Sequence, residues 1–288
     1  MFLHTKLENR KKPIKVAFIG CGKFVSMFLA QYNHLDKIEI DSIVDINIEQ
    51  AKKNCEGSGL KPATINEINF SSSLDNILDR NIEIYIEATG NPIVGTVHAI
   101  KIIKNKKSVI LVNVEADITC GKYLSDLAIE NGVICSMAYG DQPSLILEQV
   151  EWARLNGFLV VCAGKGTKYH PSFEYSTPDT VWGHYGLTKQ RAENESGMNP
   201  KMFNSFLCGD KSAIEMCAVS NAANLKCPNN GLTFPPIGGN VKPFIGHFKF
   251  AALLTAHISI ADLSPHKKLL NILGFIPDSI SARSLVNP

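Results

Sequence analysis

The hydrophobic positions of the first 140 residues fall into short segments of two kinds. Some are continuous or alternating apolar runs of strand length, and others repeat every three or four residues, as in an amphipathic helix. Strands are predicted at 16–19, 38–44, 82–86, 109–112 and 133–135, and helices at 24–32, 48–55 and 94–103. Strands that alternate with helices indicate βαβ units and a parallel sheet covered on both faces. The predicted fold class is therefore α/β, with an N-terminal doubly wound parallel sheet of the Rossmann type.

The pattern changes after residue 140. A connecting helix is predicted over 141–157, because Asp141 can cap it, Pro143 suits its first turn and Gly157 suits its end. A strand-like run at 158–162, long polar loops and a helix-like segment around 211–224 follow. We expect a Rossmann domain over 1–140, a second α+β substrate or catalytic domain over 141–242, and a divergent C-terminal tail over 243–288.

The composition excludes several classes of protein. With 288 residues, 45% of them hydrophobic, and a net charge of only +2, the chain is typical of a globular protein and lacks the basic excess of a nucleic-acid or membrane-surface binder. The longest apolar run, 250–261, is interrupted by polar residues, whereas a membrane span needs about 20 apolar residues. No secretory signal is visible, and the eight cysteines show no CxxC spacing, so we expect reduced thiols in a cytoplasmic protein.

A glycine-rich turn follows the first predicted strand. The sequence Gly20-Cys21-Gly22-Lys23-Phe24-Val25 leads into a helix. The spacing is typical of a dinucleotide-binding turn of which the first two glycines are present. In such turns, backbone amides and the N-terminus of the helix approach a pyrophosphate. Val25 stands where a third glycine would allow close contact between helix and strand, which predicts looser packing there. Asp45 ends the second strand, where a carboxylate can accept hydrogen bonds from the adenosine ribose and favours NAD over NADP. An ordinary turn and a surface aspartate are the structural alternative.

Several ordered segments resemble one family of enzymes. They are GKFVSMFLAQ (22–31), IEATGNP (86–92), VNVEAD (112–117), SMAYGDQPSLI (136–146), AGKGTKY (163–169), STPDTVWGHYGLT (176–188), GMNPKMFNSF (197–206) and KSAIEM (211–216). In these segments the chain resembles the homoserine dehydrogenase-like reductases, which include the 1-deoxy-D-xylulose 5-phosphate reductoisomerase-like (DXR-like) enzymes. Members usually continue into a C-terminal domain, often of the SAF type. The resemblance ends near Val241, so we expect that domain to be lacking here.

The residues that follow the fourth and fifth strands are expected to border the cofactor. Thr89, Gly90 and Asn91 follow the fourth strand, and Asn113 and Glu115 follow the fifth. Ligands of open α/β sheets bind at the carboxyl ends of the strands. Homoserine dehydrogenases carry a lysine in the corresponding fifth-strand loop. Glu115 near that place argues against homoserine as the substrate.

Lysines and a glutamate of the second domain are the first candidates for catalysis. Lys165 and Lys168 lie on one glycine-flanked turn that suits a phosphate or carboxylate, unless both are solvated loop lysines. Lys211 and Glu215 lie four apart on one helical face. The resemblance makes Lys211 the first choice for stabilising a forming alkoxide, and Glu215 an acid, base or metal ligand. An exposed ion pair is the alternative.

Asp179 and His184 could add a proton relay or a metal ligand, although a loop histidine bonded to backbone is the simpler interpretation. The spacing indicates no metal site, whereas the resemblance permits a divalent cation.

We therefore expect a cytoplasmic NAD(P)-dependent oxidoreductase that acts on a small polar oxo or hydroxy compound, with or without a phosphate group. The expected partners are a small-molecule substrate and further copies of the chain, with no nucleic acid and no membrane. The alternatives are a homoserine dehydrogenase and a truncated, non-catalytic NAD(P)-binding protein.

Overall fold

The computed structural model describes residues 3–160, 163–165, 170–195, 197–227, 251–253 and 260–262. The chain forms two compact units, Met1–Ala138 and Tyr139–Pro288. Nearly all of the predicted tail, 243–288, lies outside the described residues.

A six-stranded parallel sheet forms the centre of the first unit. Its strand order is β3-β2-β1-β4-β5-β6, so the order reverses between β1 and β4. Every pair of neighbouring strands in this sheet is parallel. The strands are β1 (Ile14–Ile19), β2 (Ile38–Val44), β3 (Asn69–Ser71), β4 (Ile84–Glu87), β5 (Ser108–Leu111) and β6 (Cys135–Met137). This topology confirms the predicted doubly wound Rossmann sheet.

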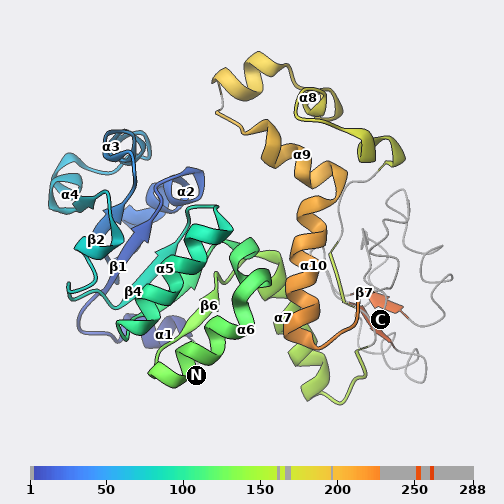
Figure 1. The fold of residues 1–288 in the computed structure, drawn as a ribbon, viewed down its shortest axis with the longest axis horizontal. Coiled ribbons are helices and arrows are strands. Elements are labelled where there is room, and N and C mark those ends of the chain that lie inside the picture. Colours follow the sequence, from blue (N-terminus) through green and yellow to red (C-terminus); the bar gives the residue numbers. More distant parts are fainter. Residues whose placement is uncertain are drawn as a thin grey trace. The chain divides into compact units, whose positions relative to one another are not determined.

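Helices cover both faces of this sheet (Figure 1). One hydrophobic core joins the sheet to α5 and α6 through residues such as Ile102 and Leu124, and the other joins it to α2 and α3 through Leu29 and Ala51. The helices are α1 (Leu3–Glu8), α2 (Lys23–Gln31), α3 (Ile48–Gly57), α4 (Pro62–Glu67), α5 (Pro92–Lys104) and α6 (Val114–Asn131), with the 3-10 turns η1 (Tyr32–His34) and η2 (Leu74–Asn76).

Asparagines begin three of these helices. The side chains of Asn47, Asn91 and Asn113 accept hydrogen bonds from first-turn amides of α3, α5 and α6. Such N-caps satisfy amides that have no partner within the helix. Each asparagine lies between a strand and the helix that follows it. The caps therefore also fix where the loops at the carboxyl edge of the sheet end.

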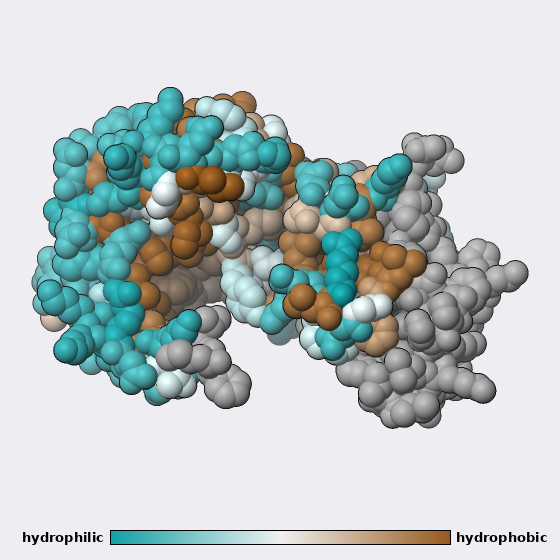
Figure 2. Space-filling model, turned by 90° about the horizontal axis from the view of Figure 1, so that it is seen from below, coloured by the Kyte–Doolittle hydropathy of each residue, from teal (hydrophilic) through white to brown (hydrophobic). Residues whose placement is uncertain are grey.

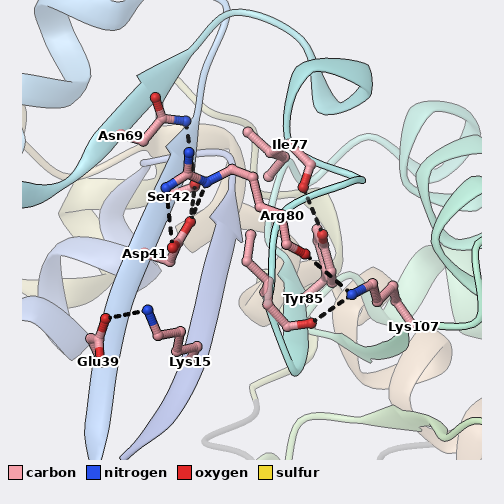
Figure 3. Close-up of polar contacts among 10 residues, drawn as sticks. Lys15, Glu39, Asp41, Ser42, Asn69, Ile77, Arg80, Tyr85 and Lys107 are labelled. Carbon is pink, nitrogen blue, oxygen red and sulfur yellow. Dashed lines mark hydrogen bonds and ion pairs between the residues drawn. The ribbon is translucent and has the colours of Figure 1, made fainter.

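A network of polar contacts ties the sheet to the loop before β4 (Figure 3). Arg80 makes two hydrogen bonds to the Asp41 carboxylate of β2, at 2.6 and 3.2 Å. The Arg80 guanidinium holds the pKa of Asp41 below its ordinary value, with help from Ser42 and against the effect of burial. Tyr85 is fully buried and donates its hydroxyl to the carbonyl of Ile77, at 2.9 Å. The network fixes the start of β4.

The second unit is mainly helical in its described part. Its helices are α7 (Gln142–Leu155), α8 (Val181–Tyr185), α9 (Pro200–Cys208) and α10 (Asp210–Ala223), with the 3-10 turn η3 (Pro171–Tyr175) and the π-helical turn η4 (Gln190–Glu195). Two short antiparallel strands, β7 (Ala251–Leu253) and β8 (Ile260–Asp262), complete it. Asp141 caps α7, as the sequence predicts.

The strand predicted over 158–162 is not found in its described part. Residues 158–160 belong to no strand, and residues 161–162 lie outside the described part. Phe158 stacks on Trp152, and Val160 packs in the core that α7 and α10 share. The apolar run is therefore buried against helices, which its periodicity alone could not distinguish from pairing in a sheet.

Hydrophobic side chains also reach the surface. Figure 2 shows apolar patches between hydrophilic areas on one face. The exposed large hydrophobic residues include Met27 of α2 and Ile93 and Val97 of α5. Across the described residues, no helix has both the length and the hydrophobicity to cross a bilayer.

Candidate functional site

The turn after β1 has the backbone that a dinucleotide site needs. Gly20 has a φ of +86°, and a Cβ there would lie 2.9 Å from the carbonyl oxygen of Ala88 and from the Cα of Thr89. Gly22 is the N-cap of α2, has no side-chain cap, and would have open space around a Cβ. The first glycine therefore lets two loops touch, and the second leaves the start of the helix accessible to a ligand.

Side chains from the loop after β2 and from α3 hold this turn in place. One carboxylate oxygen of Asp45 accepts from the amide of Cys21 at 2.8 Å, and the other accepts from the amide of Asn47 at 2.8 Å. Asn54 donates to the carbonyl of Cys21 at 2.7 Å. Asp45 is half-buried, and its oxygens have further lone pairs, so it can both fix the turn and accept from a ribose hydroxyl.

Val25 does not loosen the packing of α2. Its side chain is fully buried and belongs to the core that contains Phe18 and Leu29. The looser contact predicted from the missing third glycine is therefore not observed. Lys23 and Phe24 form the first turn of α2 with exposed or half-exposed side chains, beside the open Gly22.

The loop after β4 lies against the glycine turn. Thr89, Gly90 and Asn91 join β4 to α5, and Gly90 has a φ of +71°. Asn113 is 2% exposed, and its amide donates to the carbonyl of Asn91 at 2.8 Å while its oxygen accepts from the amide of Ala116. The polar atoms of Asn113 thus bond within the protein, where they support the loop. Glu115 is half-buried in the first turn of α6.

A buried ion pair marks the second unit. Lys165 is 5% exposed and Glu215, on α10, is 1% exposed, and the ammonium of the first contacts the carboxylate of the second. Burial lowers the pKa of Lys165 to about 8, against the opposing charge of Asp141 and with a smaller contribution from the nearby charge of Lys211. A lysine that titrates near neutrality can donate or accept a proton, as catalysis requires.

A lysine from another segment contacts the glutamate of the predicted Lys211 and Glu215 face. Glu215 is bonded to Lys165, and Lys211 is a half-buried neighbour whose charge acts on Lys165. Helical spacing could not reveal this contact, because Lys165 is 50 residues away in sequence. Lys168 lies outside the described residues.

Asp179 and His184 belong to a different part of the second unit. Asp179 is exposed before α8, and the ring of His184 packs edge-on against Phe173 at 4.9 Å. Around them Trp182 and Phe203 form a small core. The described residues contain no group of three or more histidines, cysteines or carboxylates that could hold a metal ion.

Sequence reasoning overlooked Glu87 and Asn54. Glu87 is the last residue of β4 and is fully buried. A carboxylate that ends a strand covered on both faces, directly before Ala-Thr-Gly-Asn, was the available signal. Asn54 gave none, because its bond to the glycine turn depends on the packing of α3.

Two family models match the chain, one for each unit. Residues 14–139 match the oxidoreductase family with the NAD-binding Rossmann fold, and residues 140–251 match the catalytic domain of the oxidoreductase DRL. Both models describe oxidoreductases and the first describes NAD binding. These descriptions agree with the predicted class of enzyme, an NAD(P)-dependent oxidoreductase, and with the predicted nicotinamide cofactor.

Several solved structures are similar to part of this chain. The WlbA dehydrogenase from Bordetella pertussis, in complex with NADH and UDP-GlcNAcA, is 21% identical with a TM-score of 0.42, over 57% of this chain and 49% of that one. An oxidoreductase from Bacillus cereus is 24% identical with a TM-score of 0.41, over 54% and 44%. Biliverdin reductase from Synechocystis sp. PCC 6803, in complex with biliverdin and NADP+, is 20% identical with a TM-score of 0.38, over 55% and 48%. The chain spans about half the length of these structures. No curated protein matches it.

Proposed function

We propose that the protein interconverts a carbonyl and an alcohol on a small polar substrate, with NAD(P) as the hydride carrier. The observation that carries this proposal is the glycine turn at the β1–β4 reversal, open at Gly22 and held by Asp45. The finer assignment, to the homoserine dehydrogenase-like and DXR-like reductases, rests on the sequence resemblance. It favours a substrate that carries a phosphate or a carboxylate.

The first unit would hold the cofactor through backbone and one carboxylate. The pyrophosphate would lie at the amides of Gly22, Lys23 and Phe24, where the helix N-terminus favours negative charge. Asp45 would accept from the ribose hydroxyls, which favours NAD because a 2′-phosphate would meet a carboxylate. When bound, the nicotinamide supplies or accepts the hydride.

The second unit would supply the proton. As a carbonyl is reduced, negative charge develops on its oxygen, and the Lys165 ammonium can stabilise that charge and then donate a proton to it. Glu215 orients the ammonium through the buried ion pair. Lys211 adds positive charge, which keeps the pKa of Lys165 low enough for proton release and suits an anionic group on the substrate.

This assignment predicts a pH dependence with a defined direction. Because the pKa of Lys165 lies at about 8, the proton donor is present below that pH, so kcat for reduction should fall as pH rises through about 8. The reverse oxidation needs neutral Lys165 and should rise over the same range. Removal of the Lys211 charge in Lys211→Met should raise the pKa of Lys165 and move both midpoints to higher pH.

The test compares Lys165→Met with Lys189→Met, which changes an exposed lysine of the same unit. Purified protein is assayed with NADH and NADPH against keto acids, amino-acid aldehydes including aspartate semialdehyde, and sugar phosphates. Lys165→Met should bind NADH as the wild type does and lose about 100-fold or more in kcat, within the range for general acid catalysis. Lys189→Met should remain active.

Three outcomes would change the assignment. If the wild-type protein bound neither NADH nor NADPH at millimolar concentration, the redox function would be excluded. Turnover with homoserine would indicate a homoserine dehydrogenase despite Glu115. Tight NADH binding without turnover on any carbonyl would indicate a non-catalytic NAD(P)-binding protein.

We also propose that the protein works in the cytoplasm as a homo-oligomer on a small-molecule substrate, without nucleic acid or membrane; the resemblance also permits a divalent cation. Exposed apolar side chains such as Ile93 and Met27 support association between copies. Light scattering coupled to gel filtration tests the oligomer, and activity after dialysis against EDTA tests the metal.

A further inference from the structure

A buried carboxylate lies directly beneath the loop that follows β4. Glu87 has no exposed surface. Its Oε1 accepts a hydrogen bond from the amide of Thr89 at 3.2 Å and a second, shorter one from the Thr89 hydroxyl. Burial of a carboxylate is costly unless hydrogen bonds compensate it. The two bonds from Thr89 are therefore the main interaction that holds this side chain and this loop together.

The surroundings of Glu87 are built around it. A Cβ on Gly95 of α5 would lie 2.7 Å from Glu87 Oε2 and 2.6 Å from the side-chain nitrogen Nδ2 of Asn113. His98, one turn later on α5, places Nδ1 3.7 Å from Oε1. Within the described part of the chain, Glu87 Oε2 and His98 Nδ1 have no hydrogen-bond partner. Packing alone would favour an apolar residue here, so we look for the role of this carboxylate in the bonds that its Oε1 accepts.

The Thr89 loop in turn limits the position of the glycine turn. A Cβ on Gly20 would lie 2.9 Å from Thr89 Cα and from Ala88 O, so the two loops are in direct contact at the β1–β4 reversal. Dinucleotides bind at this reversal in doubly wound sheets. A shift of the Thr89 loop would therefore alter the side of the crevice that this loop forms.

We propose that Glu87 is a positioning residue for the cofactor: through Thr89 it fixes the loop that forms the nicotinamide-proximal side of the dinucleotide crevice. This inference rests on the proposed function, since it requires a nicotinamide nucleotide in that crevice. Glu87 is buried and acts through Thr89. The adenosine side is held independently by Asp45, so only ligands that extend past the pyrophosphate depend on Glu87.

The experiment measures affinities for NADH and for AMP by titration calorimetry in three variants. Glu87→Met keeps the side-chain length and removes the acceptor. Glu87→Gln restores an acceptor oxygen without the charge. Glu83→Gln, at an exposed glutamate directly before the same strand, is the matched control. Circular dichroism melts of each variant show whether it is folded.

Glu87→Met should weaken NADH binding about tenfold, which is the loss expected for hydrogen bonds to a charged acceptor. It should change AMP binding less than about twofold, because the adenosine side is untouched. Glu87→Gln should recover NADH affinity, and Glu83→Gln should match the wild type.

Three results would overturn the inference: equal losses for NADH and AMP, an unchanged NADH affinity in Glu87→Met, or a Glu87→Gln as weak as Glu87→Met. If Glu87→Met does not fold, Thr89→Val replaces it, because it removes only the hydroxyl donor, with Thr89→Ser as the restoring variant. Absence of NADH binding by the wild type would instead contradict the proposed function.

Discussion

The buried pair of Lys165 and Glu215 allows a sharp prediction about stability. Lys165→Met and Glu215→Met each remove one charge and leave the other buried without its partner. The double variant removes both charges and replaces them with side chains of similar length. We expect each single variant to be much less stable than the wild type, and the double variant to be close to the wild type or more stable.

The magnitudes follow from the burial. Only 5% of Lys165 and 1% of Glu215 is exposed, so each single substitution should lower the free energy of unfolding by about 3–5 kcal/mol. The double substitution should leave the free energy of unfolding unchanged or raise it by up to about 4 kcal/mol. The lowered pKa of Lys165 adds a second signature. A shift from 10.5 to about 8 corresponds to about 3 kcal/mol by which the folded state disfavours the charged lysine. The wild type should therefore gain stability relative to the double variant as pH rises from about 8 to 10.5.

Urea unfolding followed by tryptophan fluorescence provides the assay. Both tryptophans, Trp152 and Trp182, lie in the second unit, so the signal reports the unit that contains the pair. Lys201→Met, at an exposed lysine, should stay within about 0.5 kcal/mol of the wild type. If the double variant were destabilised by the sum of the two single costs, about 6–10 kcal/mol, Lys165 and Glu215 would not stabilise each other, and the prediction would be wrong.

Further predictions concern the first unit. Gly95→Ala should destabilise it by about 1–3 kcal/mol, because the new Cβ would meet Glu87 and Asn113; Gly57→Ala, at a helical glycine with open space, should be neutral or stabilising in the same thermal melts. Asn91→Ala should cost about 1 kcal/mol through loss of the cap on α5, and an unchanged melting temperature would contradict that role. Asp45→Ala should weaken NADH binding about tenfold in calorimetry, because it frees the Cys21 amide and removes the ribose acceptor; equal affinity would show that the turn needs no support.

The Rossmann sheet could be predicted because its strands are buried on both faces and therefore read as short apolar runs. β2 was predicted with the bounds it has in the structure, 38–44. The longest helix, α6, was overlooked because its buried positions are few and charged residues interrupt its apolar stripe. β3 was overlooked because only three residues pair with β2. Burial by neighbouring elements determines such segments, and local periodicity does not report it.

The candidate site likewise has parts that could be predicted from the sequence and parts that could not. The glycine turn and Asp45 were predictable, because their spacing from a strand end determines where they lie. The contact of Lys165 with Glu215 was not, because it joins segments 50 residues apart through the packing of α10. Glu87 shows the same limit: its burial results from α5 approaching through Gly95, which no pattern within β4 reveals.

The sheet ends in very short strands on both sides. β3 and β6 have three residues each, whereas β2, next to β3, has seven. Only a few backbone amides and carbonyls are therefore left unpaired along either border, and another chain has little length on which to add a strand. A protein built in this way can carry a strongly apolar parallel sheet and still avoid edge-to-edge aggregation, so the association between copies that we propose should proceed through helix surfaces.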